Sequence, residues 1–348
     1  MRKETLTIYD IAKMAEVSVS TVSRVLNGKS VVNEQTRQKV LNIMLRHNFQ
    51  PNRLAQSLLK KESMTIGCIL PDITNLFFST MFLQTEVYSA ELGYTMLLCN
   101  SLNNRDMESS YLRVLLERRV DGILFMGGRI NDSKPRPQFV QEMQTVAERV
   151  PLILINGCMP DIDAYVVQSD EQQGFTDLLQ YVYNIGHRKI GLIGGIAGVT
   201  PTDVKTSAFH KAVETLGLLT RPSWVLPHGF SVESGVEAMQ SLLQQVELPT
   251  AVLAINDLVA IGAIKEAQRQ GLRVPEDISV AGFDDTFLAQ VCTPSLTTVN
   301  HNYAQLAHMA IDTLMAVATG QTVPPLSVVA TRVILRDSCR AITNPESC

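Results

Sequence analysis

Apolar and polar residues alternate with the period of an α-helix in three short segments at the start of the chain. Thr7 and Asp10 form a capping-box signature where the first segment begins. The apolar residues that follow fall on one helical face: Ile8, Ile11, Ala12 and Ala15. This pattern predicts a helix over about 8–15. Asn33 can cap the last segment, which predicts a third helix packed behind the first two.

The middle segment follows the tight connection AEVS. Ser18 can cap a helix there, and Asn27-Gly28 supplies a left-handed stop at its end. The side chains predicted to face outward are mostly small and polar, with one arginine: Val19, Ser20, Thr21, Ser23 and Arg24. Two short helices joined by a tight turn, the second with such a face, have the geometry that lets a helix enter the major groove. An ordinary pair of packed helices shows the same spacing.

From Met64 onward, short apolar runs alternate with helical segments. The first series of runs is MTIGCILP, TMLLCN, GILFMG and PLILIN, with helices near 78–92, 106–118 and 136–149. The second series is VVQSD, KIGLIGG, AVLAIN and ISVAGF, with helices near 171–185, 203–217, 233–246 and 257–270, and LTTV precedes a helix at about 303–318. Such runs indicate buried parallel strands with crossover helices. Two α/β series predict two lobes with a small-molecule crevice at the strand carboxyl ends.

Charge favours the nucleic-acid interpretation of the three helices. Residues 1–61 carry 11 Lys and Arg against four Asp and Glu, a net charge of +7, whereas the other 287 residues carry −11. A basic head on an acidic body is expected of a module that neutralises phosphates. A solvated basic face without a partner is the alternative.

Several kinds of chemistry are not indicated. The chain lacks HExxH, CxxC, GxSxG and GxxxxGK[ST], so we expect no enzyme activity, no cofactor and no metal site. The six cysteines are scattered, which favours reduced thiols. No apolar stretch reaches the roughly 18 residues of a membrane span, and MRKE is not the start of a signal peptide, so we expect a cytoplasmic protein without a membrane partner.

The literal residues of the head carry a family resemblance. The run TIYDIAKMAEVSVSTVSRVLNGK, with PNRLAQSL behind it, resembles the DNA-binding headpiece and hinge helix of the lactose repressor / galactose repressor family of bacterial regulators. The resemblance implies a hinge segment, residues 52–58, that becomes helical on operator DNA, with Leu58 as a wedge in the minor groove. The alternative for Leu58 is an apolar residue that packs on the body. The implied DNA contacts are Thr7, Val19, Ser20, Thr21, Ser23, Arg24, Asn27, Asn52, Arg53, Ala55, Gln56 and Leu58.

The turn between the first two helices departs from the family. This chain has Glu16 where the family usually has glycine. If the position is left-handed, a residue other than glycine costs about 1–2 kcal/mol there. We expect a weaker headpiece and no change of function.

The body resembles the effector domain of the same family, whose fold is similar to that of periplasmic sugar-binding proteins. The resemblance rests on PDITNLFF, VDGILFMGG, GHRKIGLIGG, INDLVAIGAIKEAQRQGLRVPEDISVAGFDD and PSLTTV, and covers the chain from Leu6 to about Arg336. The implied fold is an all-α helix-turn-helix headpiece (1–50), a hinge helix (51–61) and a two-lobed α/β domain with parallel sheets (62–348). Three crossings between the lobes are expected near Asp161, Cys292 and Thr322. They give an N-lobe of about 62–161 and 293–321 and a C-lobe of about 162–292 and 322–337.

The same resemblance implies the effector contacts Phe77, Phe78, Lys205, Phe230, Asn256 and Asp284. An aromatic face suits a sugar or base ring, and amides or carboxylates at strand ends suit paired hydroxyls. Phe78 could instead belong to the apolar face of the next helix. For Asp257 and Asp285 we expect N-capping of the segments that follow.

Lys205 stands where the family usually has an arginine. Lysine keeps the positive charge but loses the planar fork that grips two oxygens. A cation in the crevice would also accept a phosphate or a carboxylate, so sugars, sugar acids and sugar phosphates stay open as effectors. An exposed Lys205 with no ligand role is equally compatible with the sequence.

These observations predict a ligand-responsive repressor of carbohydrate genes that binds a palindromic operator as a homodimer. Binding of the effector would shift the closure of the lobes and thereby the spacing of the two hinge segments. One alternative is a catabolite-control regulator with a phosphorylated carrier protein as corepressor. Another is a cytoplasmic sugar-binding protein with an incidental helical head. The last residues, DSCRAITNPESC, lack an apolar period, and we expect them to be frayed.

Overall fold

The computed structural model describes residues 6–26, 32–47, 49 and 63–342. The chain divides into two compact units, residues 1–63 and 64–348. This boundary lies close to the predicted end of the hinge at residue 61.

The first unit is a bundle of short helices. It contains α1 (Ile8–Ala15), α2 (Val19–Leu26) and α3 (Glu34–Arg46), as predicted. The backbone N–H of Thr7 donates to the Asp10 carboxylate over 2.8 Å, and the Thr7 hydroxyl oxygen accepts from the Asp10 backbone, so the capping box is confirmed. Ser18 and Asn33 accept from the backbones of Thr21 and Thr36 in the same way. One apolar cluster joins the helices: Ile11, Ala12, Ala15, Val22, Val25, Val40 and Met44.

Glu16 ends α1 in the left-handed conformation, with φ 55° and ψ 42°. The sequence predicts strain if this position is left-handed. It is left-handed, so Glu16 carries the strain of that conformation. Its carboxylate accepts a charge-assisted hydrogen bond from Lys39 of α3 over 3.1 Å. Because both side chains are largely exposed, this ion pair offsets little of the strain.

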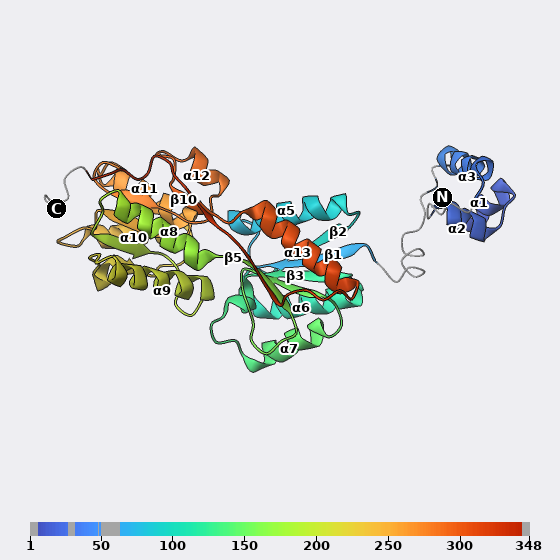
Figure 1. Cartoon of the computed structure of the whole chain (residues 1–348), viewed down its shortest axis with the longest axis horizontal. Coiled ribbons are helices and arrows are strands. Elements are labelled where there is room, and N and C mark those ends of the chain that lie inside the picture. Colours follow the sequence, from blue (N-terminus) through green and yellow to red (C-terminus); the bar gives the residue numbers. More distant parts are fainter. Residues whose placement is uncertain (1–5, 27–31, 48, 50–62, 343–348) are drawn as a thin grey trace. The chain divides into compact units, whose positions relative to one another are not determined.

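The second unit has two lobes (Figure 1). The N-lobe sheet is six-stranded and parallel, in the order β11-β5-β4-β3-β1-β2. Its strands are β1 (Thr65–Leu70), β2 (Thr95–Asn100), β3 (Gly122–Met126), β4 (Leu152–Ile155), β5 (Tyr165–Ser169) and β11 (Leu326–Val329). One face packs on α5 (Leu76–Glu91) and α13 (Tyr303–Ala318), and the other on α6 (Arg105–Glu117) and α7 (Pro137–Ala147). A short 3-10 helix, η1 (Gly128–Asn131), follows β3.

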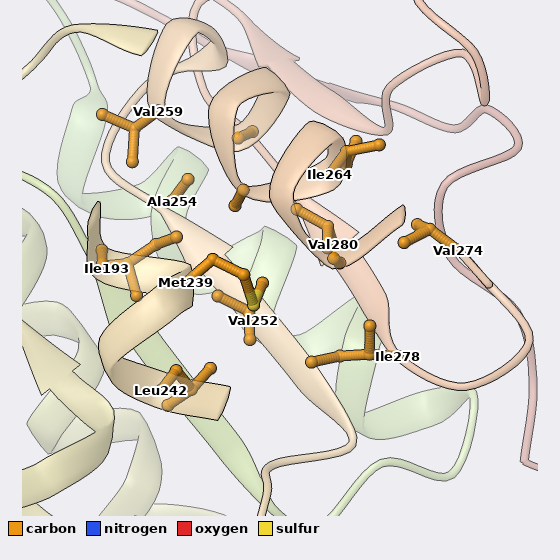
Figure 2. Close-up of a cluster of buried hydrophobic side chains, with 14 of the residues drawn as sticks. Ile193, Met239, Leu242, Val252, Ala254, Val259, Ile264, Val274, Ile278 and Val280 are labelled. Atoms are coloured by element: carbon orange, nitrogen blue, oxygen red, sulfur yellow. The ribbon is translucent and has the colours of Figure 1, made fainter. Parts of the chain in front are cut away.

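The C-lobe is built around a four-stranded parallel sheet in the order β7-β6-β8-β9. Its strands are β6 (Ile190–Ile193), β7 (Val225–Leu226), β8 (Ala251–Ala254) and β9 (Ser279–Ala281). Its helices are α8 (Glu171–Asn184), α9 (Thr200–Thr215), η2 (Pro222–Trp224), α10 (Val232–Leu243), α11 (Asp257–Arg269) and α12 (Phe287–Val291). Figure 2 shows Val252 of β8 beside Met239 of α10, and Ile264 of α11 belongs to the same buried cluster on this face. Continuous apolar strands are thus buried on both faces, as the sequence pattern predicts.

The predicted crossings between the lobes are displaced along the chain. VVQSD forms β5, which pairs with β4 in the N-lobe sheet, so the first crossing follows Ser169 and the expectation near Asp161 is wrong. The second crossing lies between β10 (Thr298–Asn300) and α13, after the predicted Cys292. The third lies between β11 and β12 (Arg332–Ile334), after the predicted Thr322. β10 and β12 pair antiparallel at the C-lobe end of these crossings.

The C-terminal segment is packed where the structure describes it. The backbone of Val280 in β9 donates to the Ser338 carbonyl over 2.9 Å, and Ile342 donates to the Ile185 carbonyl. Ser338 and Cys339 are buried. The expectation of a frayed tail is therefore wrong for residues 337–342, because they line the edge of the C-lobe sheet. Residues 343–348 lie outside the described part of the chain.

The described cysteines, at positions 68, 99, 158, 292 and 339, carry free thiols, and burial raises the pKa of Cys99 to about 11. A buried thiol of this kind is a weak nucleophile. Across the described residues, no helix has both the length and the apolar content to cross a membrane.

Candidate functional site

The outward face of α2 is the candidate nucleic-acid surface. Ser20 and Arg24 are exposed, while Val19, Thr21 and Ser23 are half-buried. The hydroxyl of Ser18 forms hydrogen bonds with those of Ser20 and Thr21 over 2.7 and 2.8 Å, so these hydroxyls are held together at the start of the helix. The face thus offers small hydrogen-bonding groups and one long cation, whereas Val19, predicted to face outward, packs partly against the apolar core of the head. Such a helix can approach base edges closely.

The other predicted DNA contacts have mixed outcomes. Thr7 is exposed, but its hydroxyl also donates to Asp10 over 2.6 Å within the capping box. The remaining predicted contacts lie outside the described residues: Asn27, Asn52, Arg53, Ala55, Gln56 and Leu58. Their roles stay predictions that rest on the family resemblance.

The crossings bring buried polar side chains together between the two lobes. His301 lies between β10 and α13, and its ring nitrogens contact the Ser169 hydroxyl at the end of β5 over 2.6 Å and the Asp284 carboxylate over 3.1 Å. The Asn156 amide after β4 donates to the same hydroxyl over 3.0 Å. Asp284 holds φ at 115°, which residues other than glycine seldom adopt, and strain of this kind clusters at ligand sites. Ser169, His301 and Asp284 therefore form a hydrogen-bonded row that joins two crossings to the end of the C-lobe sheet.

Burial sets the protonation of this row. Desolvation raises the pKa of Asp284 to about 7, although the positive charge of Lys205 opposes the shift. Desolvation lowers the pKa of His301 to about 4, so its imidazole is neutral at pH 7. A neutral His301 that donates from Nε2 to Asp284 accepts at Nδ1 from Ser169. The row can then be satisfied without a full charge on the imidazole.

Aromatic rings lie beside the row. The Phe77 ring at the start of α5 is 4.9 Å from the His301 ring and 5.1 Å from the Phe78 ring. Both phenylalanines are half-buried and pack on the N-lobe core, so the core packing that the sequence left open for Phe78 is present and their contact with an effector stays a prediction. The Phe283 ring, next to Asp284 and part of the C-lobe core, lies 5.2 Å from the His301 ring.

Lys205 of α9 is buried, which excludes the exposed side chain that the sequence left open. Its ammonium lies 3.3 Å from the carboxylate of Glu171, the first residue of α8, and 4.0 Å from the centroid of the Phe283 ring. The charges of Lys205 and Glu171 both act on the pKa of His301, with opposite signs. The lysine therefore lies near His301 and already has an anionic partner.

Asn256 and Phe230 lie together in the C-lobe, but their polar atoms are occupied. The Asn256 carbonyl oxygen caps α11 by accepting from the Val259 backbone over 2.9 Å, and its amide donates to the Phe230 carbonyl over 3.0 Å. This hydrogen bond holds the Phe230 backbone against Asn256 at the end of β8. The Asn256 amide is already engaged where the sequence predicts a hydroxyl contact.

Asp257 and Asp285 are not N-caps, which corrects the sequence expectation. Asn256 caps α11, whereas the buried Asp257 accepts from the backbone and hydroxyl of Thr286 over 2.7 and 3.0 Å and from the Thr298 hydroxyl. Desolvation and the nearby Asp284 carboxyl raise the pKa of Asp257. Asp285 pairs with Arg336 and accepts from Asn300 over 2.8 Å. Both carboxylates therefore hold the loop after β9 against the crossings.

The comparisons with known proteins decide the family. Residues 7–52 match the bacterial regulatory proteins of the lacI family, and residues 179–339 match the periplasmic binding protein-like domain. The repressor CytR of Escherichia coli (strain K12) is 31% identical over 337 residues, with 97% of each chain covered. Catabolite control protein A of Priestia megaterium is 33% identical over 319 residues, covering 91% of this chain and 94% of the relative. This chain belongs to the lacI family.

A crystal structure of the Lac repressor dimer, bound to operator and the anti-inducer ONPF, superposes on this lacI-family chain with a TM-score of 0.85. The two sequences are 26% identical, and the superposition covers 97% of this chain and 100% of the other. The predicted architecture of a helix-turn-helix head and a two-lobed periplasmic-binding-like body is thereby confirmed. The chain is a DNA-binding transcriptional repressor of the lacI family.

Three polar residues that lie between the lobes of this lacI-family chain were missed in the sequence: Ser169, Glu171 and His301. Ser169 and Glu171 flank the first crossing, which the sequence reasoning placed before VVQSD, so their position between the lobes was hidden. Assignment of VVQSD to the N-lobe sheet would have indicated that the polar residues at its end lie at a crossing between the lobes. His301 follows LTTV and is recognisable as a site residue only once β10 is known to lead into a crossing.

The lobes also touch at the rim of the crevice. The backbone N–H of Ser133 in the N-lobe donates to the Gly198 carbonyl over 2.9 Å, and the Thr200 hydroxyl donates to the Asn131 carbonyl over 3.1 Å. A hollow of about 310 Å³ lies beside this contact and includes Asp203 and Lys211 of α9. None of the six predicted effector residues lines it.

Proposed function

We propose that this repressor binds a two-fold symmetric operator as a homodimer and that a small carbohydrate-like effector in the crevice controls the binding. The observation that carries the proposal is the exposed polar face of α2 on a head with a net charge of +7. A basic head supplies phosphate contacts, and the polar face supplies base contacts. A protein of this composition is expected to act in the cytoplasm.

A single headpiece is too small to bind a specific site tightly on its own. Specific interfaces bury about 1,000–2,500 Å² of protein surface, and helix-turn-helix proteins reach this by binding two half-sites as dimers. Exposed apolar side chains gather on two neighbouring N-lobe elements: Leu83 and Val87 of α5, and Leu98 of β2. An apolar patch on the body supports association through that surface. Dimers would place two copies of α2 on successive major grooves.

Control by an effector follows from the crossings. A ligand that binds one degree of lobe closure more tightly shifts the population toward it. The row of Ser169, His301 and Asp284 spans the crossings, so a ligand that contacts the row acts where the lobes rotate. The shift would change the spacing of the two hinge segments, and therefore whether residues 52–58 fold on DNA. The direction of the response, release or promotion of DNA binding, depends on which state the ligand prefers.

The crevice chemistry supports a ring-shaped effector with hydrogen-bonding groups. The half-buried Phe77 can stack against a ring, and Asp284 can accept from hydroxyls. A catabolite-control regulator is the second candidate, supported by the 33% identity to catabolite control protein A across 94% of that protein. Binding of a phosphorylated carrier protein to the body would distinguish this candidate from a regulator that needs a small ligand alone.

The operator is tested by selection from a pool of random duplex DNA with the full chain. We expect an enriched sequence with two-fold symmetry and a footprint on both half-sites. In gel-shift titrations on that sequence, Leu58→Ala should lower the affinity for the operator. The neighbouring control Leu59→Ala should keep near-normal affinity. Enrichment of an asymmetric site would contradict the dimer, and equal affinities for the two leucine variants would contradict the wedge.

The effector site is tested separately by thermal shift. A screen of neutral sugars and nucleosides should yield a compound that raises the melting temperature of the wild type. Asp284→Ala should abolish that rise without a change in operator affinity in the absence of ligand. A retained rise in Asp284→Ala would remove this residue from the site.

A further inference from the structure

Lys205 is the cation among the six residues predicted to contact the effector, so its state decides which charge the crevice accepts. Its ammonium is 3.3 Å from the Glu171 carboxylate. The side chains of Lys205 and Glu171 are 5% and 14% exposed, so the pair is shielded from water. The ring of Phe283 covers the ammonium at 4.0 Å. Lys205 thus has both an anionic partner and an aromatic one before any ligand binds.

The other groups near this ion pair add no positive charge. His301 is neutral at pH 7, because burial lowers its pKa to about 4. Asp284 contributes a carboxyl that is partly ionised at that pH. Asp257 and Asp285 are acids as well, and Asp285 is already paired with Arg336. A phosphate or carboxylate in the crevice would therefore meet Glu171 and Asp284 and would have to displace Glu171 to reach Lys205.

Such displacement is costly. Taking an anion out of water into a shielded site is favourable only when an unpaired cation or several donors receive it. Here the cation is taken, and the displaced Glu171 would be left near Asp284 without its partner. Neutral hydroxyls or ring N–H groups carry no such penalty, since they can donate hydrogen bonds to the outer lone pairs of the carboxylates.

We infer that Glu171 is a specificity-determining residue that neutralises Lys205 and restricts the crevice to uncharged polyhydroxy or heterocyclic effectors. This inference rests on the proposed function only in taking the crevice as the effector site. It narrows the sequence expectation, under which sugar acids and sugar phosphates were equally open. Removal of the Glu171 charge should turn the crevice into an anion site.

The test compares the wild type with Glu171→Gln and the double variant Glu171→Gln/Lys205→Met, each as the full chain. The probes are inorganic phosphate, ribose 5-phosphate and galacturonate, with ribose and galactose as neutral partners, measured by thermal shift and calorimetry. Glu247→Gln is the matched control, because it removes the acidic partner that lies 3.1 Å from Lys189 outside the crevice. Ionic strength is held constant with sodium chloride.

We expect phosphate and the two anionic sugars to give no saturable stabilisation of the wild type or Glu171→Gln/Lys205→Met. Glu171→Gln should bind at least one anion about tenfold or more tighter than the wild type, and Glu247→Gln should not. If Glu171→Gln folds poorly in chloride, refolding in phosphate should recover it. Saturable binding of an anionic sugar to the wild type that is lost in the double variant would overturn the inference. The inference would also be overturned if Glu171→Gln bound none of the anions more tightly than the wild type.

The same proteins are titrated with the selected operator without ligand. If the wild-type protein selects no DNA sequence, the proposed function is contradicted, but the comparison of anion binding between the variants still stands. Conversely, operator binding with anion binding to the wild-type crevice would keep the proposed function and defeat the inference about Glu171. The two failures are therefore distinguishable.

Discussion

Replacement of Arg129 by methionine should destabilise the body more than most single substitutions. The guanidinium, which has no exposed surface, donates to the carboxylate of the equally buried Glu108 over 2.7 Å. It also pairs with Glu142 and donates to the Arg105 carbonyl over 2.7 Å and the Ser109 hydroxyl over 2.8 Å. Methionine fills much of the same space but leaves these acceptors without their donor.

The cost follows from the charge that stays behind. Breaking a buried ion pair costs about 3–5 kcal/mol, because the remaining charge is uncompensated. Arg105 still lies 2.9 Å from Glu108, which places the expected loss near the lower end, at about 3 kcal/mol. For a domain of this size that corresponds to a drop in melting temperature of roughly 6–12 °C.

Urea unfolding followed by far-ultraviolet circular dichroism measures this loss, and the fluorescence of Trp224, the single tryptophan, follows the C-lobe separately. The double variant Arg129→Met/Glu108→Gln removes the stranded charge and should recover at least half of the loss. A single variant within about 1 kcal/mol of the wild type would refute the reasoning. A double variant less stable than the single would also refute it.

Three further predictions concern other parts of the chain. Glu16→Gly should stabilise the headpiece by up to about 1 kcal/mol in thermal melts, because relief of left-handed strain exceeds the loss of the exposed Lys39 pair; a loss of similar size would contradict this. Burial lowers the pKa of His187 to about 4, below its value in the unfolded chain. The free energy of unfolding therefore has its full value above about pH 6.5 and falls by about 3 kcal/mol in total as the pH drops toward 4. His187→Gln should flatten that slope in urea titrations between pH 7 and 4, and an unchanged slope would exclude this residue as its source. Ser169→Ala should cost about 1–2 kcal/mol by the same assay, through loss of the contact with His301, whereas a neutral effect would show that the row adds nothing.

Local signals explain what the sequence could predict. The caps at Thr7, Ser18 and Asn33 lie within three residues of the groups they bond, so the three head helices follow from short-range chemistry. Continuous apolar runs likewise identified the buried parallel strands. The lobe to which a strand belongs is a long-range property, and for this reason VVQSD was assigned to the wrong series.

The candidate site shows the same division. Lys205 was identified by its place in a family motif, but its partner Glu171 lies on another helix and carries no local mark of the pairing. Asp257 was expected to cap a helix because it follows a strand, yet its partners Thr286 and Thr298 come from later segments. Pairings of this kind depend on how strands and crossings are arranged in space, which periodicity does not reveal.

The central claim is that the outward face of α2 reads operator sequence, and Arg24→Ala tests it most directly. Gel-shift titrations of wild type and variant on the selected operator and on random duplex of equal length give the ratio of the two affinities. We predict that Arg24→Ala loses about 1–3 kcal/mol on the operator and much less on random DNA, so that the ratio falls. An equal loss on both DNAs would mark Arg24 as a phosphate contact and would contradict the account of α2 as the reading helix.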